Sequence, residues 1–95
     1  MSLIRNIQFT KLLKADGCLR EFNFRKSFTG GKIVFNVDVT DDRNNRIYFQ
    51  MQKENADWKI QQQELPAWII INEMNFCEFI EKEFSPSETV RKSQL

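Results

Sequence analysis

The chain contains no histidine, so its chemistry would have to come from carboxylates, lysine, tyrosine or a bare cysteine. A Ser-His or Cys-His nucleophile, a histidine base and a histidine metal ligand are therefore excluded. The chain also has no GxGxxG, GxxxxGK[ST] or HExxH motif, and the pair Gly30-Gly31 lacks the helix start that a phosphate-binding loop needs. We therefore expect no enzyme and no cofactor, since an active site would have to rest on a carboxylate or a cysteine.

Two further patterns are weaker candidates for chemistry. The acidic stretch 38–42 suggests calcium, but an EF-hand loop begun at Asp38 needs glycine and glutamate where Arg43 and Phe49 stand. The stretch therefore favours a polar hairpin loop over a metal site. Cys18 and Cys77 belong to no CxxC pair, so we expect two buried, free thiols.

Basic side chains are concentrated near the N-terminus, although the net charge is only +1. Residues 1–32 carry seven basic and two acidic side chains, whereas the remainder carries seven basic and eleven acidic ones. This asymmetry predicts a basic edge or face, with a solvated surface of mixed charge as the alternative. The basic N-terminal region and the expected outer face of the sheet together define the candidate nucleic-acid-binding residues Arg20, Arg25, Lys26, Tyr48 and Lys59.

These residues would be positioned by strands, because apolar residues recur at every second position over 32–63. The alternating set is Ile33, Phe35, Val37, Val39, Ile47, Phe49, Met51, Trp58 and Ile60. Asp- and Asn-rich turns at 41–45 and 55–57 separate three antiparallel strands. Residues 19–28 alternate in the same way and are followed by the reversal Thr29-Gly30-Gly31.

The two ends of the chain are less clear. Residues 3–14 fit either a strand through Phe9 or part of a helix, and Asp16-Gly17 fits a type I′ hairpin or a helix end. Near the other end, Trp68 and the three β-branched isoleucines 69–71 predict a last strand, with Asn72 as the N-cap of an amphipathic helix. Alternatively, the helix begins at Pro66 as its first residue.

The predicted fold is α+β: an antiparallel meander of four or five strands with one C-terminal amphipathic helix packed on one face. Residues 1–84 form a single domain, and residues 85–95 are a polar tail. The apolar side of that helix carries Phe76, Cys77, Phe79, Ile80 and Phe84. The expected outer, wet face of the sheet carries Glu21, Asn23, Arg25, Val34, Asn36, Asp38, Tyr48, Gln50, Gln52, Lys59, Gln61 and Gln63.

Residues 32–39, running through a loop to 46–49, resemble the aromatic strand, loop and strand of a PUR repeat. Residues 69–73, with the helical positions that follow, resemble that family's last strand and helix. The element order is also similar to the ββββα unit of Whirly-type proteins. This resemblance implies binding of single-stranded DNA or RNA and pairing of two units. The chain departs from it by placing Asp38, Thr40 and Asp42 where these families present basic and aromatic residues.

The sequence therefore predicts a small, non-enzymatic binding module, with two functions left open. One is weak binding of single-stranded nucleic acid. The other is protein interaction or homodimer formation through a strand edge or a tryptophan-bearing patch. No apolar run approaches the roughly 20 residues of a membrane span, and no signal-peptide pattern is present, so the expected location is the cytoplasm.

Overall fold

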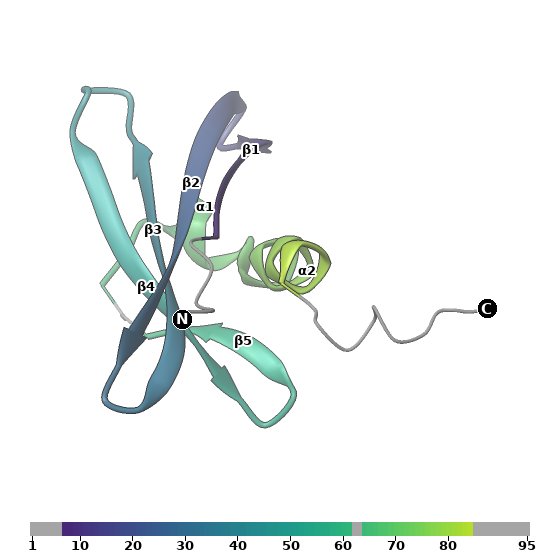
Figure 1. Ribbon diagram of the computed structural model, residues 1–95. Helices are drawn as coiled ribbons and strands as arrows, with labels where there is room; N and C mark the ends of the chain where they lie inside the picture. Colours follow the sequence, from purple (N-terminus) through teal and green to yellow (C-terminus); the bar gives the residue numbers. More distant parts are fainter. Residues whose placement is uncertain (1–6, 62–63, 85–95) are drawn as a thin grey trace.

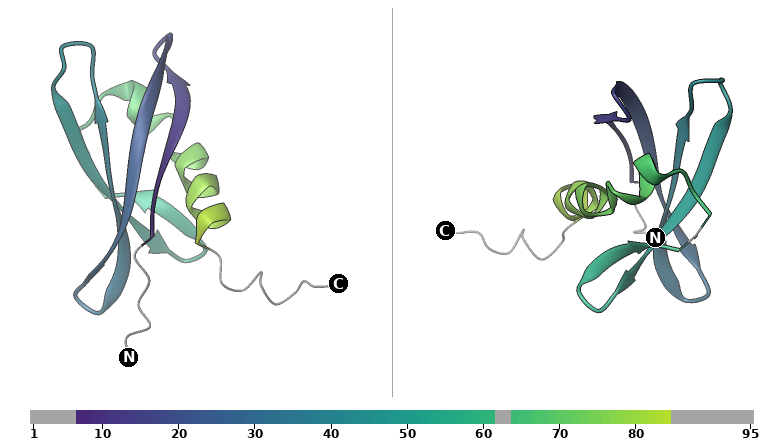
Figure 2. Two further views of the ribbon diagram at one scale, coloured as in Figure 1. Left: turned by 45° about the horizontal axis from the view of Figure 1, so that its top comes forward. Right: turned by 180° about the vertical axis from the view of Figure 1, so that it is seen from behind.

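The computed structural model describes residues 7–61 and 64–84 and shows a curled sheet with two helices on its inner side (Figures 1 and 2). The predicted polar tail, residues 85–95, and Gln63 lie outside these described ranges. The strands are β1 (Gln8–Ala15), β2 (Cys18–Thr29), β3 (Lys32–Thr40), β4 (Arg46–Glu54) and β5 (Asp57–Ile60). The helices are α1 (Ala67–Ile70) and α2 (Glu73–Glu83). The predicted α+β class and antiparallel meander are confirmed.

The sheet has the order β1-β2-β3-β4-β5, with every neighbouring pair antiparallel. Two-residue turns join the first three strands, with positive φ at Asp16 and Gly17 (56° and 79°) and at Gly30 and Gly31 (58° and 80°). Two consecutive positive φ angles are typical of the type I′ turn, whose twist suits the flanking strands. The hairpin interpretation of Asp16-Gly17 is therefore confirmed, and the helical alternative for residues 3–14 is wrong over β1.

A loop organised by Asp41 connects β3 and β4. Its Oδ1 atom accepts the backbone N–H groups of Asn45 (2.8 Å) and Arg43 (2.9 Å). These backbone hydrogen bonds, that from Asn45 most of all, lower the pKa of the Asp41 carboxyl below its ordinary value of 3.8. Asn44 completes the reversal at φ 69°, a conformation that asparagine tolerates. Asp41 and Asp42 of the acidic stretch thus lie in a hairpin loop, whereas Asp38 belongs to β3.

The core lies between the inner face of the sheet and α2, and Phe76 is at its centre. Its ring is 5.0 Å from Phe22, 6.0 Å from Phe24 and 5.5 Å from Phe49, measured between centroids. Phe22, Phe24 and Phe76 are at most 1% exposed. Because the sheet curls, both of its edges approach α2: Lys11 of β1 pairs with Glu83 at 3.2 Å. The phenylalanine-rich helix face predicted from the sequence is confirmed.

The last predicted strand, residues 68–71, is wrong, because these residues form α1 and the turn after it. The N–H groups of Ile69 and Ile70 donate to the Pro66 carbonyl, and that of Ile71 donates to Ala67. A strand here would need a free sheet edge, but side chains of α2 occupy the β5 edge, and Trp68 packs instead on Arg20 and Phe22 of β2. Tertiary packing therefore overrides the β propensity of the isoleucines. Pro66 is the N-cap of α1, so this helix begins at Ala67, one residue after the start given by the alternative prediction.

Asn72 does precede α2, but it makes no side-chain N-cap hydrogen bond. Its Nδ2 atom instead donates to the Trp68 carbonyl (2.7 Å), and its Oδ1 atom accepts from Asn75 (2.7 Å). The side chain therefore fastens the end of α1 to the start of α2.

Cys77 is buried as predicted, whereas Cys18 is exposed beside the first hairpin turn, and both are free thiols. The prediction for Cys18 is wrong because β2 begins at this residue, outside the helix-covered core. Neither helix in the part of the chain that the structure describes is long and apolar enough to cross a membrane.

Candidate ligand-binding face

The outer face of the sheet carries two adjacent rows of polar side chains, set by the strand register. One row crosses β1 to β4 through Thr10, Asn23, Asp38 and Tyr48. The next row crosses the same strands through Gln8, Arg25, Asn36 and Gln50. Residues directly opposite in an antiparallel pair share a face, so each row is a continuous line across the sheet.

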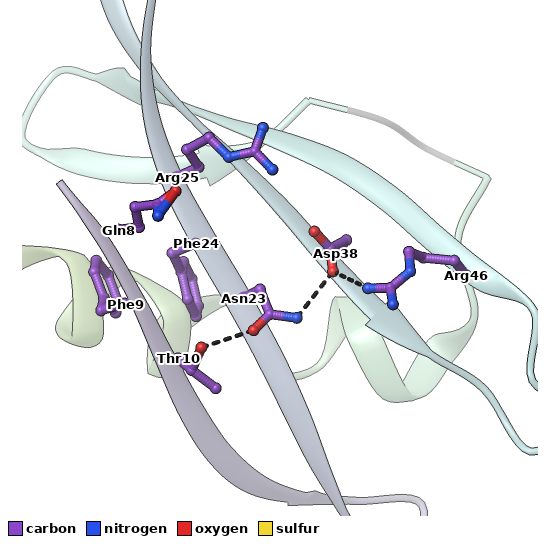
Figure 3. Close-up of a pocket in the computed structure, with 8 residues that line it drawn as sticks. All are labelled: Gln8, Phe9, Thr10, Asn23, Phe24, Arg25, Asp38 and Arg46. Carbon is purple, nitrogen blue, oxygen red and sulfur yellow. Dashed lines mark hydrogen bonds and ion pairs between the residues drawn. The ribbon is translucent and has the colours of Figure 1, made fainter. Parts of the chain in front are cut away.

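Hydrogen bonds hold most of the first row in place (Figure 3). Thr10 Oγ1 donates to Asn23 Oδ1 (2.7 Å), and Asn23 Nδ2 donates to Asp38 Oδ1 (3.0 Å). The same Asp38 oxygen accepts from Arg46 Nη1 (2.6 Å), an ion pair whose carboxylate side chain is only 13% exposed. Arg46 therefore compensates the one acidic charge in these two rows.

A second set of hydrogen bonds joins the amides of β3 and β4. Gln50 Nε2 donates to Asn36 Oδ1 (3.1 Å), and Gln52 Nε2 donates to Gln50 Oε1 (2.9 Å). These amides are half-buried and each is held by a neighbour. Asn36 and Gln50 retain further donor and acceptor positions for a ligand.

Two shallow hollows lie over these rows, with volumes of about 420 Å³ and about 410 Å³. They share Arg25 and Asp38, so they adjoin. The first is lined by Gln8, Phe9, Thr10, Asn23, Phe24, Arg25, Asp38 and Arg46. The second is lined by Arg25, Asn36, Val37, Asp38, Tyr48, Phe49 and Gln50.

Arg25 and Tyr48 are both exposed on this face. Arg25 forms no ion pair or side-chain hydrogen bond with another described residue, and Figure 3 shows its guanidinium apart from the Asp38–Arg46 pair. Tyr48 is 65% exposed and lines the same hollow as Arg25. The hollow therefore combines a cation, an aromatic ring and fixed amides.

The structure divides the five predicted nucleic-acid-binding residues between the two faces of the sheet. Arg25, Tyr48 and Lys59 lie on the outer face. Lys59 belongs to β5 and lies opposite Gln52 of β4. Arg20 and Lys26 lie on the inner face, so they cannot share a surface with Arg25. The sequence contained this signal: both residues are an even number of positions from Phe22 and Phe24, and side chains alternate along a strand.

Arg20 is a structural residue. It is 6% exposed, its Nε donates to the Ala15 carbonyl (2.9 Å), and its guanidinium lies 4.3 Å from the centre of the Trp68 ring. The ammonium of Lys26 lies 5.4 Å from the Phe84 ring centre at the edge of the core. Their assignment to a nucleic-acid surface is not supported by this placement.

Three features of the outer face differ from the sequence analysis. Gln8 and Thr10 line the first hollow but were missed, because residues 3–14 could not be assigned to a strand. Arg46 was missed because it begins its strand beside a loop. Val34 was expected to be exposed but is 0% exposed. The two tryptophans also leave no exposed tryptophan patch, since Trp58 is buried and Trp68 half-buried against the core.

Comparison with protein-family models, with curated proteins and with solved structures finds no match. The resemblance to PUR and Whirly-type units thus stays a prediction. The structure departs from those units by having five strands and by forming a helix at residues 67–70.

Proposed function

We propose that this chain is a small, non-enzymatic module that binds a short segment of single-stranded nucleic acid on the outer face of its sheet. The observation that carries the proposal is the single hollow that Arg25 and Tyr48 line together with Asn36 and Gln50. A nucleotide offers the three complementary groups: an anionic phosphate, a flat base and hydrogen-bonding base edges.

Each side chain suits one of these groups. An arginine guanidinium matches the planar geometry of a phosphate and can donate two hydrogen bonds to it. An exposed tyrosine offers a ring on which a base can stack, and stacking contributes about 1–3 kcal/mol per base. The amides of Asn36 and Gln50 can donate to and accept from base edges or sugar hydroxyls.

The charges of the face predict weak binding with a shallow dependence on salt. Arg46 is neutralised by Asp38, so Arg25 and Lys59 are the cations proposed to meet phosphates. They stand on β2 and β5, about 14 Å apart across the strands at about 4.8 Å per spacing, and Lys59 lies two residues further along because it pairs with Gln52. Two phosphate contacts on a single strand correspond to a slope of about −1.4 for log K against log salt.

The test is fluorescence anisotropy with labelled single-stranded DNA and RNA oligomers at several salt concentrations. We expect Arg25→Ala and Tyr48→Ala each to weaken binding by about tenfold, since about 1.4 kcal/mol corresponds to a factor of ten. Lys26→Ala is the matched control, because it removes the next basic residue of the same strand but from the inner face. Absence of binding at low salt, or equal loss with Lys26→Ala, would refute the proposal.

A further inference from the structure

The two edges of the sheet are treated differently by the rest of the fold. At the β5 edge, the N–H of Ile60 donates to Glu73 Oε2 (2.8 Å), and that of Trp58 donates to Cys77 Sγ (3.4 Å). Both acceptors belong to α2, so the helix occupies this edge. The β1 edge receives no backbone hydrogen bond from any residue of ranges 7–61 and 64–84 other than those of β2.

The register shows which backbone groups of β1 point outward. The N–H of Lys26 donates to the Ile7 carbonyl (2.9 Å). Ile7 and Lys26, which lie opposite each other just before β1, are therefore a hydrogen-bonded pair. Hydrogen-bonded and non-hydrogen-bonded pairs alternate in an antiparallel ladder. The odd-numbered residues of β1 therefore face β2, and the backbone groups of residues 8, 10, 12 and 14 face the open edge.

An open edge of this length is a template for another strand, and its side chains suit a second copy of itself. Leu12 and Leu19 are 63% and 66% exposed on the outer face. Leu12 lies opposite Glu21, and Leu19 lies opposite Lys14, so the two leucines are diagonal neighbours. Two exposed aliphatic side chains of the outer face thus lie together beside the open edge.

We propose that the chain forms a two-fold symmetric dimer in which β1 pairs antiparallel with the β1 strand of a second copy. This dimer does not depend on the proposed ligand. Two registers of such a symmetric strand pair leave only one residue of β1 unpaired, one centred on Lys11 and the other on Leu12. Centred on Lys11, the pairing sets the two lysines directly opposite each other, which is unfavourable for like charges. Centred on Leu12, it sets leucine against leucine, and Lys14 meets the partner's Thr10.

The register centred on Leu12 is therefore the proposed one. It matches residues 9–15 with residues 15–9 of the partner and gathers Leu12 and Leu19 of both copies around the axis. Leu12 has its backbone groups on the open edge, so the central pair is hydrogen-bonded, with Cα atoms about 5.5 Å apart. One strand pair is small beside the roughly 1,200–2,000 Å² of a stable interface, so the dimer dissociates on dilution.

The first test is sedimentation equilibrium of the full chain from about 1 μM to about 1 mM, a range that covers weak association. We expect the average mass to rise from one chain towards two. Leu12→Pro removes the central N–H, which the monomer does not use, and proline is tolerated at strand edges. It should raise the Kd of the dimer at least about tenfold. Leu12→Lys, which opposes two charges, should do the same if the proline variant fails to fold.

Ile71→Ser is the matched control, since Ile71 is 75% exposed but lies in the turn between α1 and α2. It should leave the Kd unchanged. A chain that stays monomeric throughout, a dimer insensitive to both Leu12 variants, or a dimer lost with Ile71→Ser would each overturn the proposal.

The register has its own test, in a Cys18→Ser background with oxidised glutathione as the oxidant. Leu12→Cys should form an interchain disulfide, because a Cα separation of about 5.5 Å lies within the range of disulfides. Thr10→Cys, which faces the partner's Lys14, should cross-link at least about tenfold more slowly, a barrier difference of about 1.4 kcal/mol. Faster cross-linking of Thr10→Cys would overturn the register.

Discussion

Arg20 joins three parts of the chain that are distant in sequence, so its replacement should destabilise the fold. Its side chain is 5% exposed and lies 3.0 Å from a carboxylate oxygen of Asp42 in the β3–β4 loop. Its Nε donates to the Ala15 carbonyl (2.9 Å) at the first hairpin. Its guanidinium also stacks on Trp68 of α1, 4.3 Å from the ring centre. The substitution Arg20→Ala removes all three interactions together.

The magnitude follows from the environment of each contact. A buried hydrogen bond from a charged donor contributes about 1.5–3 kcal/mol, and the cation–π stack contributes about 0.5–2 kcal/mol. The side chain of Asp42 is 70% exposed, so that ion pair is screened and contributes at most about 1 kcal/mol. Relief of the buried charge offsets part of this sum. We therefore expect Arg20→Ala to cost about 2–4 kcal/mol, or roughly 10–30 °C in Tm.

Two further variants separate these contributions. Arg20→Lys keeps the charge but loses the planar stack and the Nε donor, so about half of the loss should remain. Asp42→Asn tests the ion pair alone and should cost at most about 1 kcal/mol, because the carboxylate faces solvent.

The assay is urea unfolding followed by far-ultraviolet circular dichroism and tryptophan fluorescence. The fluorescence of Trp68 should also shift to longer wavelength when its stacked guanidinium is removed. A free energy of unfolding for Arg20→Ala within about 0.5 kcal/mol of the natural chain would refute this account, since that is the range of surface substitutions. A loss for Asp42→Asn as large as that for Arg20→Ala would equally refute it.

Three other perturbations test single contacts. Because the pKa of Asp41 is lowered in the folded state, its ionised carboxylate stabilises the fold above about pH 4, and this stabilisation is lost as the pH falls through the lowered pKa. Asp41→Asn should therefore weaken the dependence of Tm on pH between about pH 2 and pH 5. Gly31→Ala should cost about 1 kcal/mol in urea unfolding, because φ is +80° while the added Cβ would meet no atom within 4 Å, and Gly31→Asn should cost less; a loss above about 3 kcal/mol would contradict this reasoning. Glu73→Ala should cost about 1–3 kcal/mol and speed hydrogen exchange at the Ile60 amide, whereas Glu73→Gln, which keeps an acceptor, should do so less; unchanged exchange in both would disprove the contact.

Most of the sheet could be predicted because its information is local. Alternation over 33–60 assigns each side chain to a face, and the Asp-Gly and Gly-Gly pairs mark turns whose φ angles few other residues adopt. The same alternation was sufficient to place Arg20 and Lys26 on the core face. The assignment of these two residues to a nucleic-acid surface grouped them by charge and not by their position along the strand.

The two ends of the chain could not be assigned so simply. In β1, Lys11 interrupts the apolar pattern on the inner face, and only the folded chain provides Glu83 to pair with it. Three consecutive isoleucines, in α1 and the turn after it, favour a strand, but a strand needs a neighbouring strand with free hydrogen-bonding groups. Side chains of α2 already bind the N–H groups of the edge strand β5, and no local sequence pattern indicates this.

By itself, the sequence determined the α+β class, the strand order implied by short turns, the phenylalanine-rich face of α2 and the absence of histidine chemistry. These follow from periodicity, turn residues and composition, which act over a few residues. The tertiary structure alone decided that Arg25 and Tyr48 line one hollow, that Arg20 stacks on Trp68, and that α2 occupies the β5 edge while β1 stays open. Each of these depends on residues from different strands and helices, whose proximity is set only when the sheet curls around the helix.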